Sequence, residues 1–318
     1  MLTAIPMYVS WNYTYACNFN CTHCYSRAGS YPRELDTASY RTIASKLGMS
    51  GVMRVGFGGG EPLIRRDCVE ILGVLSEYHV DTNITTNCWF LTDPVAEKLA
   101  GVKLGTVYAS LDSASKEKHD SFRRKEGSYD RVIRGIQAAV AAGLTVKLST
   151  VITTQNFSEL DQIVDVAEST GVQGIEFKRF RPTGNGSISN NLLSLPQNQD
   201  VDVQPKLEIL NKRSPLDIAL FYNDEPDGGI DAGCPCGVRS LTLRPNGDVS
   251  PCAYAKTVIG NLVRDDLGSL WRDSPALGLM RNGASACAGL IPDESPSGEG
   301  FARVRISSGP SVSESGGR

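Results

Sequence analysis

The sequence predicts an α/β protein: a partial (β/α)6 barrel of the TIM type, followed by a small C-terminal α+β module. Two observations support this fold class. Between residues 7 and 182, strand-like runs alternate six times with amphipathic helical patterns, as in a parallel sheet with helices outside it. Right-handed crossovers curl such a sheet toward a barrel. After Pro182 the alternation stops, and 318 residues suffice for one large domain with a small addition.

Six strands and five helices make up the predicted barrel. The strands cover residues 7–13, 52–57, 81–86, 105–111, 145–152 and 174–180. The first helix begins at Asp36 and Thr37, which suit an N-cap, and ends near Gly48. The other helices cover 67–78, 94–99, 129–142 and 159–168. In the helix at 129–142, apolar side chains recur at helical spacing and predict a buried face: Tyr129, Val132, Ile133, Ile136 and Val140.

Beyond the barrel, residues 183–189 are predicted to form a loop, 197–212 a helix and 217–222 a short strand. Residues 240–244 and 248–252 are predicted to pair as a hairpin around the Asn246-Gly247 turn. Of the 27 residues in 292–318, 15 are Ser, Gly or Pro, so we expect a disordered tail. We therefore divide the chain into a core (1–185), a connecting segment (186–228), a C-terminal module (229–291) and a tail (292–318).

Composition excludes several classes of protein. The chain has 32 Lys and Arg against 35 Asp and Glu, a formal charge of −3, so we expect no nucleic-acid partner. No apolar run is long enough to span a membrane, and the N-terminus lacks a secretory signal. We therefore expect a cytoplasmic protein with no membrane partner. Its nine cysteines should stay reduced and serve metal binding, catalysis or packing.

Three cysteines lie on one short segment after the first predicted strand, in the pattern Cys17-x-x-x-Cys21-x-x-Cys24. A [4Fe–4S] cluster takes four ligands, so three thiolates on one loop leave one iron open to an external ligand. A reactive cluster requires such an open iron. Structural zinc is the alternative, but zinc sites usually take four local ligands in Cys-x-x-Cys pairs. His23 would be the nearest fourth ligand, but it lies between two of the cysteines.

A glycine-rich segment, GGGEP at 58–62, follows the second strand on the same rim, where ligand sites of barrels collect. With the cysteine loop, it resembles the radical S-adenosylmethionine (SAM) superfamily. The resemblance continues in ITTN at 84–87, SLDS at 110–113 and HDSFRR at 119–124, and covers roughly residues 7–185. It implies a cluster that, once reduced, cleaves SAM. The resulting 5′-deoxyadenosyl radical takes a hydrogen atom from the substrate.

The resemblance implies roles for individual residues around SAM. Glu61 and the backbone of Gly59 and Gly60 would hold its ammonium group, and His23 would pack near its adenine. Side chains at the ends of the third to fifth strands would contact its ribose or methionine: Asn87, Ser110, Asp112 and Ser149. A turn-forming role is the alternative for the residues in the SLDS segment.

Basic residues supply further candidates. Lys178 and Arg179 end the sixth strand, and by resemblance either would meet the carboxylate of SAM. A solvated charge at the rim is the alternative for each. We expect Arg123 and Arg124 to be surface or helix-terminal charges rather than ligands.

A second group of cysteines lies in the last third of the chain: Cys234, Cys236, Cys252 and Cys287. With the hairpin before it, this group resembles the auxiliary-cluster module of radical SAM enzymes in its short "twitch" form, because the longer SPASM form needs more cysteines. It implies one auxiliary [4Fe–4S] cluster with every iron covered. The tight Cys234-x-Cys236 spacing leaves open whether both bind this cluster, and structural zinc is the alternative. Cys68 and Cys88 stand alone and are predicted to be buried thiols.

An auxiliary cluster beside the substrate predicts two-electron chemistry, because it can accept the electron of a substrate radical. We therefore expect a radical SAM oxidoreductase that dehydrogenates an alcohol of a small polar molecule. A sugar or aminocyclitol of antibiotic biosynthesis would fit, with flavodoxin or ferredoxin as electron donor. One alternative is decarboxylation of a sugar acid in a nucleoside-antibiotic pathway. The catalytic acid or base is left open, with 178–181 and 222–225 as candidate segments.

A peptide-modifying maturase is the second alternative. Many such enzymes carry a leader-peptide-binding domain, whereas this chain begins at the first barrel strand and has too few cysteines for two auxiliary clusters. On these grounds the sequence favours a small-molecule substrate. A non-enzymatic zinc scaffold is the third alternative and predicts zinc without iron.

Overall fold

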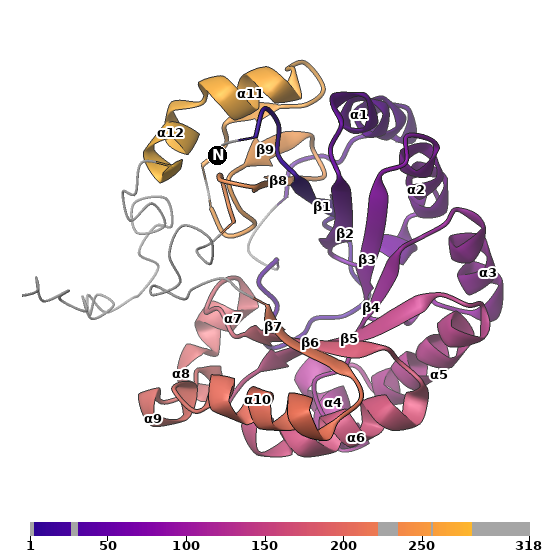
Figure 1. Ribbon diagram of the computed structural model, residues 1–318, viewed down its shortest axis with the longest axis vertical. Coiled ribbons are helices and arrows are strands. Elements are labelled where there is room, and N and C mark those ends of the chain that lie inside the picture. Colours follow the sequence, from indigo (N-terminus) through magenta and orange to yellow (C-terminus); the bar gives the residue numbers. More distant parts are fainter. Residues whose placement is uncertain (1–2, 27–30, 222–234, 256, 282–318) are drawn as a thin grey trace, which may run out of the picture.

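The computed structural model describes residues 3–26, 31–221, 235–255 and 257–281. Ten strands form one sheet in the order β10-β9-β8-β1-β2-β3-β4-β5-β6-β7. Strands β1 to β7 run parallel, and the helices that connect them cover the outer face of the curved sheet (Figure 1). The sheet ends at β7 and β10 without closing, so the predicted α/β partial barrel is confirmed.

The barrel strands are β1 (Tyr8–Thr14), β2 (Arg54–Gly59), β3 (Asp81–Thr86), β4 (Thr106–Ser110), β5 (Thr145–Ile152), β6 (Gly174–Arg179) and β7 (Asp217–Phe221). The helices outside them are α1 (Thr37–Ser50), α2 (Cys68–Glu77), α3 (Asp93–Gly101), α4 (Lys116–Arg123), α5 (Ser128–Ala141) and α6 (Leu160–Thr170). The short strand predicted at 217–222 pairs with β6 in parallel, so the barrel has a seventh strand that the six-unit prediction lacked.

The predicted helix at 197–212 is two helices, α9 (Gln197–Asp200) and α10 (Val203–Arg213). The predicted loop at 183–189 contains the one-turn helix α7 (Asn185–Ile188), which α8 (Asn190–Leu193) follows. The sequence prediction also missed α4, which has a side-chain cap at Ser115 but few apolar residues to mark a buried face. The predicted disordered tail lies outside the described residues.

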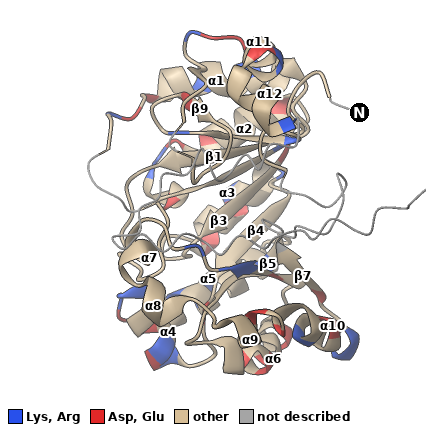
Figure 2. Ribbon diagram, turned by 90° about the vertical axis from the view of Figure 1, so that its left-hand side faces the viewer, with Lys and Arg blue, Asp and Glu red and all other residues tan. Residues whose placement is uncertain are grey.

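Strand alternation separates an apolar outer face from a polar inner face. On β1, Val9, Trp11 and Tyr13 are buried in the core, while Ser10 and Asn12 alternate with them and are only half-buried. Tyr40 of α1 packs edge-on against Trp11 and closes this part of the core. The same alternation on the other strands makes the barrel interior polar. Figure 2 shows charged residues on some strands as well as on the helices.

The C-terminal module continues the barrel sheet. Strand β8 (Ser240–Leu243) runs parallel to β1, with Tyr8 opposite Ser240. Strand β9 (Asp248–Ser250) pairs antiparallel with β8, which confirms the hairpin, and Gly247 takes the left-handed backbone conformation (φ 85°) that its turn requires. The short β10 (Gly260–Asn261) and the helices α11 (Leu267–Asp273) and α12 (Pro275–Arg281) complete the module.

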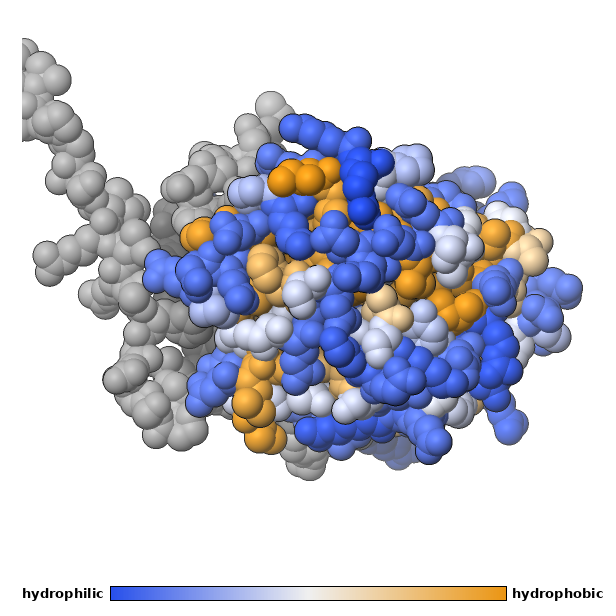
Figure 3. Space-filling model, turned by 90° about the horizontal axis from the view of Figure 1, so that it is seen from below, coloured by the Kyte–Doolittle hydropathy of each residue, from blue (hydrophilic) through white to orange (hydrophobic). Residues whose placement is uncertain are grey.

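The surface mixes hydrophilic and apolar side chains. On the face seen from below, apolar residues are scattered among hydrophilic ones (Figure 3). Leu192, Val201 and Ile209, in or between helices α8 to α10, are among the exposed large apolar residues. Within the described part of the chain, no helix is both long enough and apolar enough to cross a membrane.

Candidate active site

The loop that carries Cys17, Cys21 and Cys24 follows β1 at the carboxyl end of the parallel strands. Cys21 is buried, and the other two thiols are half-buried. Burial raises the pKa of Cys21 to about 12, partly opposed by the charge of Arg123 and reinforced by the neighbouring Cys24 and Cys17. The fold therefore brings the three predicted thiols to one place. A thiol in this setting becomes a thiolate only when a metal supplies compensating charge.

The two metal hypotheses differ in how the thiolates would be arranged. Among the described residues, no three His, Cys, Asp or Glu side chains are close enough together to hold one metal ion. A cubane cluster instead binds each thiolate through a different iron, so its ligands stand further apart. The metal content of the purified protein distinguishes the two hypotheses.

The glycine-rich segment packs directly on the start of the cysteine loop. The N–H of Gly60 donates to Thr14 O (2.7 Å), and the N–H of Glu61 donates to Ala16 O (2.8 Å). A Cβ on Gly60 would lie 2.0 Å from Ala16 O, whereas a Cβ on Gly58 would meet nothing within 4 Å. Close backbone approach therefore requires glycine at position 60, and Gly58 borders open space.

The Glu61 carboxylate is buried and joins the ends of β2 and β3. It accepts hydrogen bonds from the Thr86 hydroxyl (2.7 Å), the Asn87 N–H (2.8 Å) and the Leu63 N–H (3.1 Å). Burial raises the pKa of Glu61 to about 7, although these hydrogen bonds favour the charged form. The carboxylate thus fixes the backbone of the glycine segment and places a titratable charge beneath it.

A buried ion pair lies beside the cysteine loop. The Asp112 carboxylate is 2.6 Å from the guanidinium of Arg123 and accepts the Val151 N–H (2.9 Å). Burial alone would raise the pKa of Asp112, but Arg123 and two histidines hold it below its ordinary value. Arg123 is the last residue of α4, so it is helix-terminal, as one of the two expected alternatives has it, but it is buried and not on the surface, while its neighbour Arg124 is exposed.

The burial of Arg123 could not be predicted, because its partner Asp112 lies on a different element, beyond the reach of any periodic pattern. His23 stacks on Phe122 with its ring centroid 4.5 Å away, and its Nε2 is 3.9 Å from Asp112. Burial lowers the pKa of His23 to about 4, so its imidazole is neutral near pH 7. The Nδ1 atom of His23 and the Nε atom of Arg123 are buried without a hydrogen-bond partner in the described structure.

The other predicted SAM contacts occupy two places on the rim. Asn87 donates to Asn18 Oδ1 (2.9 Å) and accepts the Trp89 N–H (2.9 Å), so it lies against the cysteine loop. Ser110 and Ser149 are buried and lie directly opposite each other on β4 and β5.

The basic residues of β6 have partners within the protein. Arg179 forms an ion pair with Asp200 of α9. Lys178 pairs with Glu176 (3.0 Å) and lies over the ring of Tyr108 in the barrel interior. Neither residue is an isolated charge at the rim.

The second cysteine group is partly described. Cys236 is half-buried, and its backbone forms an isolated β-bridge with Ser240, the first residue of β8. Cys252 is buried just after β9. Cys234 and Cys287 lie outside the described residues. Tyr254, two residues after Cys252, packs edge-on against Tyr25, whose ring is 5.4 Å away and which follows Cys24. The two cysteine-bearing loops are therefore in contact.

Comparisons with known proteins agree with this geometry. The Radical SAM superfamily model matches residues 11–167, and a model for an iron-sulfur cluster-binding domain (SPASM) matches residues 234–289. Mycofactocin maturase MftC of Mycobacterium tuberculosis (strain ATCC 25618 / H37Rv) is 33% identical over 294 residues, which cover 89% of this chain and 74% of that protein. The chain belongs to the radical SAM superfamily.

Other similar proteins differ in what their names describe. The AdoMet-dependent heme synthase of Methanosarcina barkeri (strain Fusaro / DSM 804) is 24% identical over 301 residues, covering 88% of this chain and 86% of that protein. Streptococcus suis SuiB, solved bound to precursor peptide SuiA, has the same fold. Its TM-score is 0.73 at 20% identity, covering 88% of this chain and 67% of that chain.

This radical SAM enzyme takes a [4Fe–4S] cluster, an auxiliary cluster and SAM as cofactors. The chain's own residues fit that requirement. Three thiols converge on the loop after β1, and the unpaired buried nitrogen atoms of His23 and Arg123 lie beside it. Cys68 and Cys88 are each 1% exposed, which confirms the prediction that they are buried thiols.

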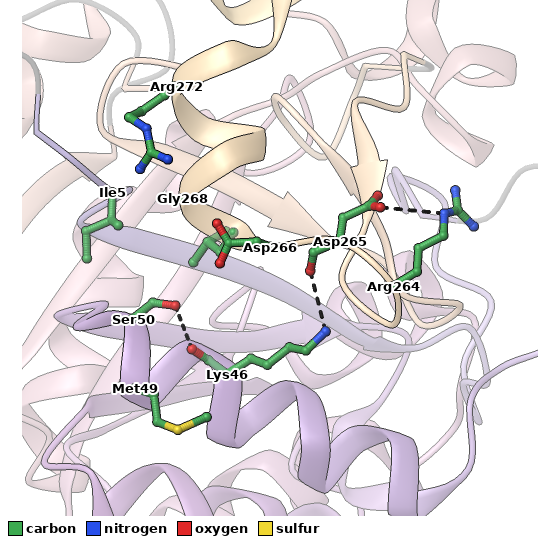
Figure 4. A pocket seen from close by; sticks show the side chains of 10 residues that line it. Ile5, Lys46, Met49, Ser50, Arg264, Asp265, Asp266, Gly268 and Arg272 are labelled. Atoms are coloured by element: carbon green, nitrogen blue, oxygen red, sulfur yellow. Dashed lines mark hydrogen bonds and ion pairs between the residues drawn. The ribbon is translucent and has the colours of Figure 1, made fainter.

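A cavity of about 540 Å³ lies elsewhere in the radical SAM fold, between the end of α1 and the start of α11 (Figure 4). The Lys46 ammonium crosses it to bond the main-chain oxygen atoms of Leu262 (2.8 Å) and Val263 (3.2 Å). The end of α1 precedes β2, so this cavity faces the amino ends of the strands, opposite the cysteine loop. We therefore do not assign the reaction to it.

Proposed function

We propose that the protein is a radical SAM maturase that modifies a peptide. The observation that carries this proposal is the similarity to MftC, a maturase that is 33% identical over 294 residues, which cover 89% of this chain. The fold shared with SuiB, solved with its precursor peptide, adds support. A peptide therefore replaces the small polar molecule as the preferred substrate. Alcohol dehydrogenation and a place in antibiotic biosynthesis stay hypotheses.

The cofactors are assigned to residues as follows. Cys17, Cys21 and Cys24 would hold the SAM cluster, and the C-terminal cysteines would hold the auxiliary cluster: Cys234, Cys236, Cys252 and Cys287. When bound, the cluster and SAM would supply a carbon-centred radical able to take a hydrogen atom from the substrate, and the auxiliary cluster would supply an electron acceptor. The protein's part is to position these groups and to exclude water from them.

Contacts to SAM are proposed from the polar groups around the cysteine loop. The backbone of Gly59 and Gly60, with the charge of Glu61 beneath it, would hold the ammonium group. Both arginines form an ion pair, Arg179 with Asp200 and Arg123 with Asp112. We assign the carboxylate of SAM to Arg123 rather than Arg179, because the Nε atom of Arg123 is buried without a hydrogen-bond partner among the described residues. A planar guanidinium suits a carboxylate.

The remaining rim residues complete the proposed site. Ser110 and Ser149 would meet the ribose or the methionine of SAM, and Asn87 would fix the cysteine loop beside them. His23, stacked on Phe122, would border the adenine. Asp112 would act through Arg123, because its carboxylate is buried against that guanidinium.

The barrel interior offers groups that can move a proton. Lys178 and Glu176 form an ion pair next to Tyr108. Burial raises the pKa of Tyr8 on β1, and the nearby charge of Glu176 raises it further. Loss of a hydrogen atom and an electron from a substrate leaves a proton to be removed. We propose the Glu176 carboxylate of this pair as its acceptor, because the Lys178 ammonium can only donate.

Transfer of deuterium into 5′-deoxyadenosine tests the substrate class. The anaerobically reconstituted, reduced protein would be incubated with SAM and, separately, a deuterated peptide pool, deuterated sugars and aminocyclitols, and a deuterated iron porphyrin. Deuterium from peptides alone supports the proposal, and deuterium from either other arm overturns it. The Cys17→Ala variant controls for label that does not depend on the cluster.

A further inference from the structure

Asn185, the first residue of α7, contacts the cysteine loop from outside it. Its side-chain amide donates to Cys21 O (3.0 Å) and to Asn20 Oδ1 (2.8 Å), and its N–H donates to Cys24 O (2.9 Å). Three hydrogen bonds from one residue thus reach the segment that carries two of the three cysteines. Asn185 follows Cys24 by more than 160 residues, and no motif identified in the sequence includes it.

Gly184 allows this approach. Its φ is 59°, and a Cβ at this position would lie 2.5 Å from both Cys24 O and Tyr25 O. Only glycine permits the connection after β6 to lie this close to the loop while keeping that conformation. The backbone is therefore shaped so that the next residue can hydrogen-bond to the cysteine loop.

The helices after Asn185 are anchored on their far side. The N–H of Thr154, in the connection after β5, donates to Leu193 O at the end of α8 (3.1 Å), and its hydroxyl donates to Leu192 O (2.5 Å). On the opposite side of the cysteine loop, the N–H of Thr22 donates to Phe122 O of α4 (3.0 Å). The loop is held between two supports, each tied to a different part of the barrel.

We propose that Asn185 is a positioning residue for the SAM cluster: its amide fixes the segment from Cys21 to Cys24, and so fixes where their thiolates meet the cluster. The amide donates to two oxygen atoms, so the role depends on its N–H groups and not on its shape. This inference is independent of the substrate class, because it concerns the cluster that every member of the superfamily carries.

The test compares Asn185→Ala, Asn185→Asp and the control Asn190→Ala in the reconstituted full chain. Aspartate has the shape of asparagine but cannot donate these bonds when charged. Asn190 is exposed on α8, and its side chain accepts a hydrogen bond from the nearby Ser194 (2.5 Å). The two measurements are the rate of iron release to a chelator and the EPR spectrum of the reduced cluster with and without SAM.

Loss of these bonds should speed iron release on the order of tenfold in both Asn185 variants. It should also change the EPR shift that SAM produces, while Asn190→Ala behaves like the wild type in both. Wild-type release and spectra in Asn185→Asp would overturn the proposal, because shape alone would then suffice. Equal acceleration in Asn190→Ala would also overturn it. Neither readout uses a substrate, so the proposed peptide activity can fail without affecting this result.

Discussion

Replacing Asp112 by Asn should destabilise the iron-free protein strongly. The Asp112 side chain is fully buried, its partner Arg123 is 8% exposed, and the two lie 2.6 Å apart. Burial lowers the pKa values of His23 and His119 to about 4, so neither histidine is charged near pH 7. The substitution therefore leaves the guanidinium without a counter-ion. Breaking a buried pair in this way costs about 3–5 kcal/mol.

Urea unfolding at pH 7.5, followed by circular dichroism, measures this loss. The matched control is Arg41→Gln, which breaks the exposed pair between Arg41 and Glu70 and should cost below about 1 kcal/mol. In the reconstituted protein the cost should be smaller, because the cluster thiolates near Arg123 then supply negative charge. A cost for Asp112→Asn no larger than that of the control would refute the reasoning.

The dependence on pH follows from the direction of the shift. The folded pKa of Asp112 lies below its ordinary value, so the native state gains stability from its ionised form above that ordinary value, about 3.9. This stability is lost as the pH falls through the folded pKa. The difference between wild type and Asp112→Asn should therefore stay constant from pH 8 to 5 and narrow only below about pH 4. A difference that changes near pH 7 would point to another group.

Three further experiments test the neighbouring features. Gly60→Ala should lower the free energy of unfolding by about 1–3 kcal/mol, because the new Cβ would lie 2.0 Å from Ala16 O. The control Gly58→Ala should leave it nearly unchanged, and equal losses would contradict the packing argument. Because burial raises the pKa of Glu61 to about 7, SAM affinity measured by calorimetry should rise about tenfold from pH 6 to 8, and Glu61→Gln should remove that rise. Cys252→Ala should lower iron from about eight to about four per chain while reductive SAM cleavage persists; loss of cleavage would show that the two clusters are not assigned correctly.

Much of the barrel follows from local patterns. The strands β3 and β5 have the predicted bounds, because both segments are rich in the β-branched residues that favour strands. The helix α4 was missed because its eight residues are mostly charged, so no apolar stripe marks its buried side. His119, Phe122 and Arg123 are nonetheless buried in it, because the contact that covers them comes from the cysteine loop and β4.

Pairings between distant segments were out of reach. A turn of two residues fixes the β8–β9 hairpin locally, but the parallel pairing of β8 with β1 joins residues more than 200 positions apart and leaves no local signal. In the candidate site, too, local features were predictable and contacts between distant segments were not. The spacing of Cys17, Cys21 and Cys24 predicts their convergence, whereas Arg123 and Asn185 depend on partners brought together only by the fold. No sequence motif identifies the substrate class. The sequence favoured a small molecule only because the chain has too few cysteines for the two auxiliary clusters of many peptide-modifying enzymes.

The pairing of β8 with β1 determines how the two cysteine-bearing loops lie relative to each other. The first loop leaves the end of β1, and Cys252 follows β9, which is hydrogen-bonded to the strand beside β1. The contact between Tyr25 and Tyr254 then joins the loops themselves. Aromatic pairs of this kind stabilise by about 0.5–1.5 kcal/mol beyond their buried area. A continuous sheet and a side-chain contact therefore set the spacing of the two cysteine-bearing loops.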